Sequence, residues 1–268
     1  RSAPPTQRQD IHARMLRRSI VVAAGVIGAT ACSTTHGIRP LGKGAVSIDA
    51  SLGGPITEVF GAPIPLPLTT VGATVGVTET TDVHLSVHPT GAALFNVFAG
   101  DFGASQQVLE NEGARPRLMG DLTTTIAGGD RDAESGKKGG VTVFIQPSFT
   151  ASWDWGKSKQ HSIYSGLTAF LQPAEKFNAL GGIYVGNRFG MRRSHLDIEL
   201  KWLQPWSDNT PIVPEFYAPG NLGAVALQFG YGFSFGGKPA SNAPASTTPA
   251  TPTPVASPPT SPLPVGTP

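Results

Sequence analysis

Apolar and polar side chains alternate along segment after segment between residues 43 and 237. Residues 195–202 separate them completely, with Leu196, Ile198, Leu200 and Trp202 on one parity and His195, Asp197, Glu199 and Lys201 on the other. Successive side chains of a strand point to opposite faces, so a period of two predicts β-structure. Such a strand must lie between an apolar and a strongly polar environment.

Residues 141–155 and 225–235 alternate in the same way, and Gly, Asn, Asp and Pro separate the segments. We expect about ten strands, which begin near Ala45, Thr70, Asp82, Ala92, Leu118, Val141, Ser162, Leu180, His195 and Ala224. Poor alternation in residues 94–99 and 163–171 leaves a count of eight open. The predicted fold is all-β: a closed antiparallel up-and-down β-barrel of about 8–10 strands, at residues 43–237.

Alternation does not say which face meets lipid, because a soluble barrel packs its apolar face inward. Aromatic side chains near strand ends resemble interfacial girdles: Trp153, Trp155, Trp202, Tyr231 and Phe235. Long connections (residues 53–68, 127–140 and 203–221) fall at one end, and short ones (78–82, 156–161 and 187–194) at the other. Residues 88–91 and 101–116 break that rule. The asymmetry favours a membrane barrel.

A leader for export precedes the barrel. Met15 opens a basic stretch, an apolar run covers residues 20–29, and small residues lead to Cys32, the only cysteine. This resembles the lipobox of bacterial lipoproteins, which implies acylation of Cys32 and, with Ser33, sorting to the outer membrane. We therefore predict an upstream extension (1–14), a signal peptide (15–31) and a lipidated linker (32–42). An ordinary cleaved signal with an incidental cysteine is the alternative.

Residues 238–268 consist mainly of Pro, Thr, Ser and Ala, and have no charge after Lys238. That composition cannot bury a core and predicts a disordered or polyproline-like tether. A tail that binds a Pro-recognising module or the cell wall is the alternative.

The formal charge of +2 belongs to the leader. Residues 1–42 hold six Arg and one Asp, whereas residues 43–237 hold 13 Lys and Arg against 17 Asp and Glu. A nucleic-acid surface needs clustered Lys and Arg on the folded part, so we expect no nucleic-acid partner.

The stretch from Ala45 to Phe235 resembles the small bacterial outer-membrane β-barrel proteins, and residues 231–235 are similar to their C-terminal assembly signal. That resemblance implies outer-membrane lipid and the barrel-assembly and lipoprotein-sorting machineries as partners. It also implies a periplasmic position for both termini.

Several ionisable residues should face the lumen of such a barrel. They are Asp49, Asp82, His84, His88, Asp121, His195, Asp197, Glu199 and Lys201. Unpaired charge in a narrow interior is costly, so mutual pairing is the simplest expectation. A sharper hypothesis makes Asp82 and His84 an acid-base pair, as in some outer-membrane proteases.

His84, His88 and His195 lack the spacing of a metal site, so we expect no metal and no cofactor. The function that we expect is structural, adhesive or that of a narrow channel, and not enzymatic. One alternative is a hydrolase acting on lipid or peptide at the outer rim. Another is a lipid-anchored periplasmic soluble barrel that binds a small apolar ligand.

Overall fold

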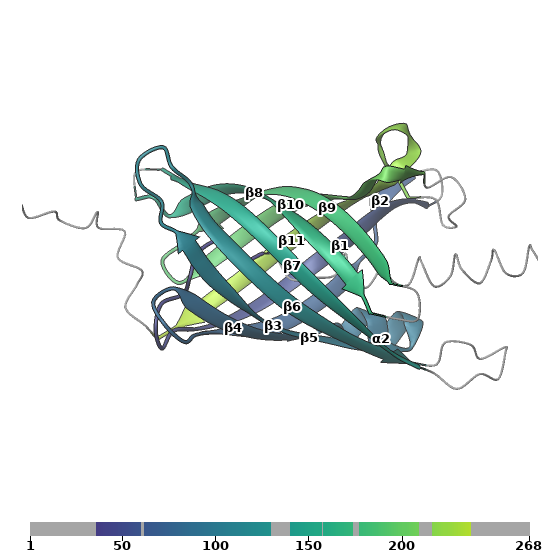
Figure 1. Cartoon of the computed structure of the whole chain (residues 1–268), viewed down its shortest axis with the longest axis horizontal. Helices are drawn as coiled ribbons and strands as arrows, with labels where there is room; N and C mark the ends of the chain where they lie inside the picture. Colours follow the sequence, from purple (N-terminus) through teal and green to yellow (C-terminus); the bar gives the residue numbers. More distant parts are fainter. Residues whose placement is uncertain are drawn as a thin grey trace, which may run out of the picture.

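Ten antiparallel strands close into a barrel in the computed structural model, which describes residues 36–59, 62–129, 140–156, 158–173, 177–208 and 216–236. Each strand pairs with the next, and β11 pairs with β1 to close the ring (Figure 1). The ten are β1 (Val46–Val59), β3 (Leu68–Gly76), β4 (Thr81–Val87), β5 (Val97–Leu109), β6 (Arg117–Gly129), β7 (Gly140–Trp155), β8 (His161–Gln172), β9 (Asn178–Gly190), β10 (Ser194–Asp208) and β11 (Leu222–Phe235). The predicted fold class is confirmed, with ten strands in the ring.

Three short elements accompany the barrel. Strand β2 (Ala62–Pro65) pairs only with the end of β1, while α2 (Pro89–Phe95) and the 3-10 turn η1 (Pro219–Asn221) lie in connections. Nine strands begin within two residues of the expected positions. The strand expected near Ala92 is wrong, because Pro89 opens a helical turn there and β5 begins only at Val97.

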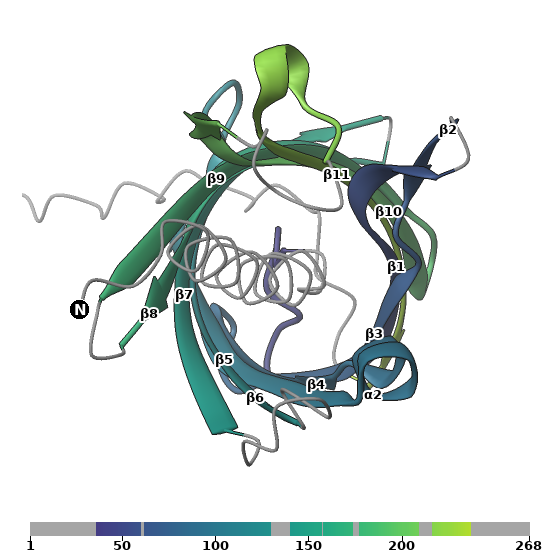
Figure 2. The same cartoon turned by 90° about the vertical axis from the view of Figure 1, so that its right-hand side faces the viewer.

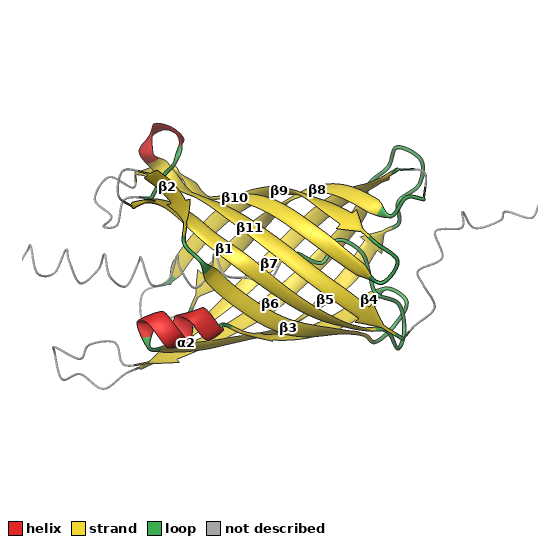
Figure 3. Ribbon diagram, turned by 180° about the vertical axis from the view of Figure 1, so that it is seen from behind, coloured by secondary structure: helices red, strands yellow, loops and turns green. Residues whose placement is uncertain are grey.

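Connections differ in size between the two ends of the barrel (Figure 3). We call one the turn end, where residues 77–80, 110–116, 156–160 and 191–193 join strands. At the other, the loop end, lie β2, α2 and η1. Both expected exceptions to the loop asymmetry were wrong: residues 88–96 hold α2, and β5 runs to Leu109, which shortens the connection to residues 110–116.

The outer face of the barrel is apolar on every strand. Each of the ten contributes an exposed large hydrophobic side chain: Leu52, Val71, Leu85, Phe102, Leu122, Phe149, Leu167, Val185, Leu200 and Phe229. Phe149 and Leu85 are 64% and 63% exposed. Soluble proteins rarely expose a continuous apolar surface of this extent. The apolar faces point outward, opposite to a soluble barrel.

Aromatic residues flank this outer band. Trp153, Trp155 and Phe235 are exposed near the turn-end termini of β7 and β11. The Trp202 indole N–H donates to the carbonyl oxygen of Leu222 over 2.8 Å at the loop end. Trp206 of β10, which the sequence reasoning did not single out, is 65% exposed. Rings at both margins have the placement of interfacial girdles.

Among the described residues, no helix is both long and apolar enough to cross a membrane. The predicted upstream extension (1–14), signal peptide (15–31), acylated Cys32 and tail (238–268) lie outside the described residues.

Candidate functional site

The barrel lumen is occupied by the chain's own residues 36–44, which we call the plug. Figure 2 shows this segment inside the ring of strands, before it turns into β1. Ile38 is fully buried there, packed with Tyr164 of β8 and Tyr184 of β9. The plug covers most of the predicted linker, so those residues are part of the packed interior.

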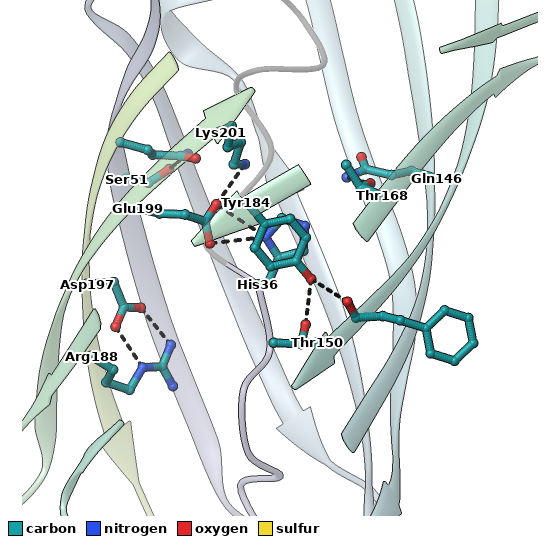
Figure 4. Close-up of polar contacts among 12 residues, drawn as sticks. His36, Ser51, Gln146, Thr150, Thr168, Tyr184, Arg188, Asp197, Glu199 and Lys201 are labelled. Carbon is teal, nitrogen blue, oxygen red and sulfur yellow. Dashed lines mark hydrogen bonds and ion pairs between the residues drawn. The ribbon is translucent and has the colours of Figure 1, made fainter. Parts of the chain in front are cut away.

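His36 holds the plug deep in the lumen (Figure 4). Its imidazole ring stacks on the ring of Tyr184, with centroids 3.7 Å apart and planes 7° apart. Its Nδ1 donates to Glu199 of β10, whose Oε2 lies 3.1 Å away. Lys201 Nζ lies 3.1 Å from Oε1 of the same carboxylate. Glu199 is thus held between one cation from the wall and one imidazole from the plug.

Two glycines allow the tyrosine rings to lie against the wall. Tyr184 pairs across the strands with Gly166, and Tyr164 pairs with Gly186. A Cβ atom at Gly166 would clash with the Tyr184 ring, and one at Gly186 with the Tyr164 ring. Because Gly has no Cβ, each ring can lie over the neighbouring strand. The Tyr184 ring therefore presents its face to His36.

Arg39 is the second anchor of the plug. Its Nη2 donates to Asp154 Oδ1 (2.7 Å), and Ser162 Oγ and the carbonyl oxygen of Lys159 lie 2.8 Å and 3.2 Å from it. Arg117 donates to both oxygens of Asp154, at 3.3 Å and 3.0 Å. Burial lowers the pKa of the Arg39 guanidinium, and the Asp154 carboxylate acts in the opposite direction. Asp154 therefore joins the plug to the wall.

Backbone groups of the plug are also bound. Ser152 Oγ donates to the carbonyl oxygen of Ile38 over 3.0 Å, and the Leu41 N–H donates to the Asp82 carboxylate at 3.1 Å. At the turn end, the Gly44 N–H donates to the carbonyl oxygen of Gly76 over 2.8 Å. Side-chain and backbone groups of the wall thus provide hydrogen-bond partners for the plug backbone.

The structure places all nine candidate lumen residues inside the barrel, but in separate groups. Asp82 binds the plug, and Glu199 with Lys201 binds His36. Asp197 forms a two-pronged ion pair with Arg188, at 2.7 Å and 2.6 Å. His195 Nε2 lies between Asp49 and Asp197, at 3.5 Å and 3.6 Å.

The other two candidate histidines, His84 and His88, each face a different carboxylate. His84 Nδ1 lies 3.8 Å from Asp121, and its Nε2 lies 3.0 Å from Thr123 Oγ1. His88 Nε2 lies 2.8 Å from Asp101 Oδ2. Across the described residues, no three His, Cys, Asp or Glu side chains are grouped so that they could hold a metal ion.

The hypothetical acid-base pair is not brought together. Asp82 accepts from the plug backbone, whereas His84 faces Asp121, and Asp82 lies at the turn-end start of β4. Thr70, His88 and Asp101 do form a hydroxyl, imidazole and carboxylate series, at 3.2 Å and 2.8 Å. Thr70 is fully buried. This series braces the wall.

A cavity of about 80 Å³ lies beside the plug. Its lining includes three carboxylates (Asp49, Asp82 and Asp121) and three histidines (His36, His84 and His195). At the loop end the interior becomes apolar, where Phe170, Leu203, Phe216, Ala224 and Ala226 form a cluster. The plug therefore occupies the lumen on the turn-end side, and this cluster lies at the loop end.

Sequence reasoning missed most of the plug's partners. His36 and Arg39 precede the barrel, in the stretch predicted to be a linker, and Tyr164 lies in residues 163–171, which alternate poorly. Asp101, Asp154 and Arg188 also face inward, and the alternation of residues 141–155 had already given Asp154 the polar parity. Only strand register brings these residues together.

No known family model matches the sequence, and no curated protein matches it. Several solved outer-membrane barrels share some likeness. The translocator domain of autotransporter NalP from Neisseria meningitidis has 11% identity and a TM-score of 0.37, covering 85% of this chain and 98% of that one. The outer membrane protein OprG from Pseudomonas aeruginosa has 10% identity and a TM-score of 0.25, covering 75% and 100%.

The outer membrane protease OmpT from Escherichia coli has 11% identity and a TM-score of 0.27, covering 71% of this chain and 97% of that one. At such TM-scores these likenesses decide nothing about this chain. Its barrel is established by its own strand pairing.

Proposed function

We propose that the chain is a bacterial outer-membrane β-barrel that serves as a narrow channel, held closed by its plug. Support for the membrane location comes from the apolar outer face. The strands β5 to β11 have 12 to 16 residues each, and a tilted strand needs about 9–11 to cross the hydrocarbon layer. With the turn end in the periplasm, short connections lie inside and long ones outside.

The proposal of a channel rests on what occupies the lumen. A barrel with only a structural role can fill its interior with side chains from its own wall. Here part of the interior is filled by a separate segment bound through polar contacts, chiefly His36 with Glu199 and Arg39 with Asp154. Contacts of this kind can be exchanged for water at modest net cost. Release of the plug would leave a passage through the lumen, past the polar groups that now bind the plug.

The proposal also includes acylation of Cys32. The support is the lipobox-like sequence before it. Three residues lie between Cys32 and His36, so at most about 14 Å separates their Cα atoms. Mass spectrometry of the mature N-terminus tests this part: a diacylglyceryl adduct on Cys32 supports it, and an unmodified residue contradicts it.

Planar-bilayer conductance tests the channel. A chain with His36→Ala and Arg39→Ala keeps its length but loses both anchors. We expect rare or small openings for the unmodified chain and frequent, larger ones for the double variant. A heat-dependent gel shift first shows that both are folded barrels. Two folded barrels that insulate equally would contradict the channel.

A further inference from the structure

The wall of the lumen carries more negative than positive charge. Seven inward carboxylates (Asp49, Asp82, Asp101, Asp121, Asp154, Asp197 and Glu199) face three permanent cations (Arg117, Arg188 and Lys201). With histidines neutral, four carboxylates are in excess. An interior of one sign concentrates ions of the opposite sign. The lumen therefore attracts cations.

The plug shows which cations fit. The Tyr184 ring and the Glu199 carboxylate form a flat apolar face with an acceptor at its edge, and the imidazole of His36 lies there almost parallel to the ring. Parallel stacking with an edge hydrogen bond suits a planar nitrogen cation, such as a guanidinium or imidazolium group. A tetrahedral ammonium cannot stack in this way.

A second position lies three residues further along the plug. There the Arg39 guanidinium meets oxygens of Asp154, Ser162 and the Lys159 backbone. Asp154 and Ser162 side chains are almost fully buried, so both oxygens are fixed before a ligand arrives. Arg117 and Lys201 hold the two carboxylates in place and also limit how tightly a further cation can bind.

We propose that the lumen wall is a binding site for small organic cations with a planar charged group, guanidinium above all, and that the plug occupies this site as an internal ligand. The inference rests on the proposed function in one respect, since the plug must leave for a solute to enter. To that function the inference adds the class of solute that the lumen would bind. A guanidinium compound and the plug would then compete for the same two positions.

Two amides of equal charge test the inference: L-arginine amide, with a guanidinium group, and L-lysine amide, with an ammonium group. Calorimetric titration uses the full chain with His36→Ala and Arg39→Ala, in detergent micelles. We expect arginine amide to bind about fivefold more tightly than lysine amide, the factor that one stacking contact supplies. The unmodified chain should bind arginine amide more weakly, because its plug is in place. Equal binding of the two amides would overturn the inference.

Variants of the wall locate the site. In the same background, Tyr184→Leu should abolish the preference for arginine amide, and Asp154→Asn should weaken its binding. Glu112→Gln is the matched control, because Glu112 is an exposed carboxylate in a turn-end connection. Preference that survives Tyr184→Leu in a folded barrel would contradict the proposed site. Preference for arginine amide in a barrel that conducts no ions would support the site and contradict the channel.

Discussion

The imidazole ring of His36 lies face to face with the phenol ring of Tyr184, with centroids 3.7 Å apart and planes 7° apart. The Tyr184 hydroxyl is fixed by Thr150 Oγ1 at 2.6 Å and by the carbonyl oxygen of Phe149 at 3.1 Å. Gly166 gives the ring its space against the wall. A residue ahead of the barrel is thus positioned by a glycine in the middle of β8.

Gly166→Ala should displace the Tyr184 ring and weaken the plug. The added Cβ would clash with the ring and with the backbone oxygen of Phe149. We expect a loss of about 1 to 3 kcal/mol in the free energy of unfolding, which is the usual cost of overpacking. Urea titration of the barrel in vesicles, followed by tryptophan fluorescence, measures this loss.

Gly140→Ala is the matched control for that substitution. Gly140 lies at the start of β7, and an added Cβ there has no neighbour within 4 Å. We expect a change within about 0.5 kcal/mol. Equal losses at both positions would contradict the role assigned to Gly166.

A double-mutant cycle on His36 and Glu199 should reveal a favourable interaction across the lumen. The two groups are 3.1 Å apart and buried, with side-chain exposures of 5% and 0%. Using His36→Ala and Glu199→Gln, we expect a coupling of about 1 to 2 kcal/mol in the free energy of unfolding. Lys201 contacts Glu199 independently of the plug. Its contribution to the effect of Glu199→Gln is the same with and without His36, so it cancels in the coupling energy.

The same cycle on two groups that do not touch provides the reference. Arg115 is exposed in a turn-end connection, so Arg115→Ala with Glu199→Gln should show additive effects. Additivity of His36 with Glu199 would mean that the plug is not seated on this carboxylate.

Phe149→Arg should lower barrel stability if the outer face meets lipid. Phe149 lies near the middle of β7 and is 64% exposed. An arginine on the lipid face near the bilayer midplane costs about 2 to 4 kcal/mol. Unfolding in vesicles measures this cost. Met191→Arg is the control, because Met191 is 52% exposed in a turn outside the apolar band and should change stability little.

The barrel could be predicted from the sequence because its two faces differ in chemistry at every strand. Leu196, Ile198 and Leu200 face outward while Asp197 and Glu199 face inward, and the alternation alone records this division. The sequence pattern predicted a strand incorrectly where the chain forms a helical turn. Residues 89–95 form a helical turn because Pro89 sets the backbone for it, although Ala92 lies where a strand was expected.

The plug could not be predicted, because nothing in residues 36–44 has a period. Its position depends on partners far along the chain: Ser152 lies 114 residues from Ile38, and Glu199 lies 163 residues from His36. Mutual pairing of the inward charges, in contrast, followed from the cost of burying them singly. The sequence could not say that Asp82 would bind the plug backbone and leave His84 to Asp121.

A disulfide between the plug and the wall tests most directly that residues 36–44 occupy the lumen. A Cβ on Gly37 would lie 3.7 Å from the Ser105 Cβ, close to the value of about 3.8 Å in disulfides. With Cys32→Ser to remove the native thiol, Gly37→Cys with Ser105→Cys should cross-link on oxidation of the folded barrel. Gly37→Cys with Ala104→Cys should not, since Ala104 lies on the outer face. We expect the first bond alone to form, and the conductance to rise when that bond is reduced. No bond with Ser105→Cys in a folded barrel would show that the plug lies elsewhere.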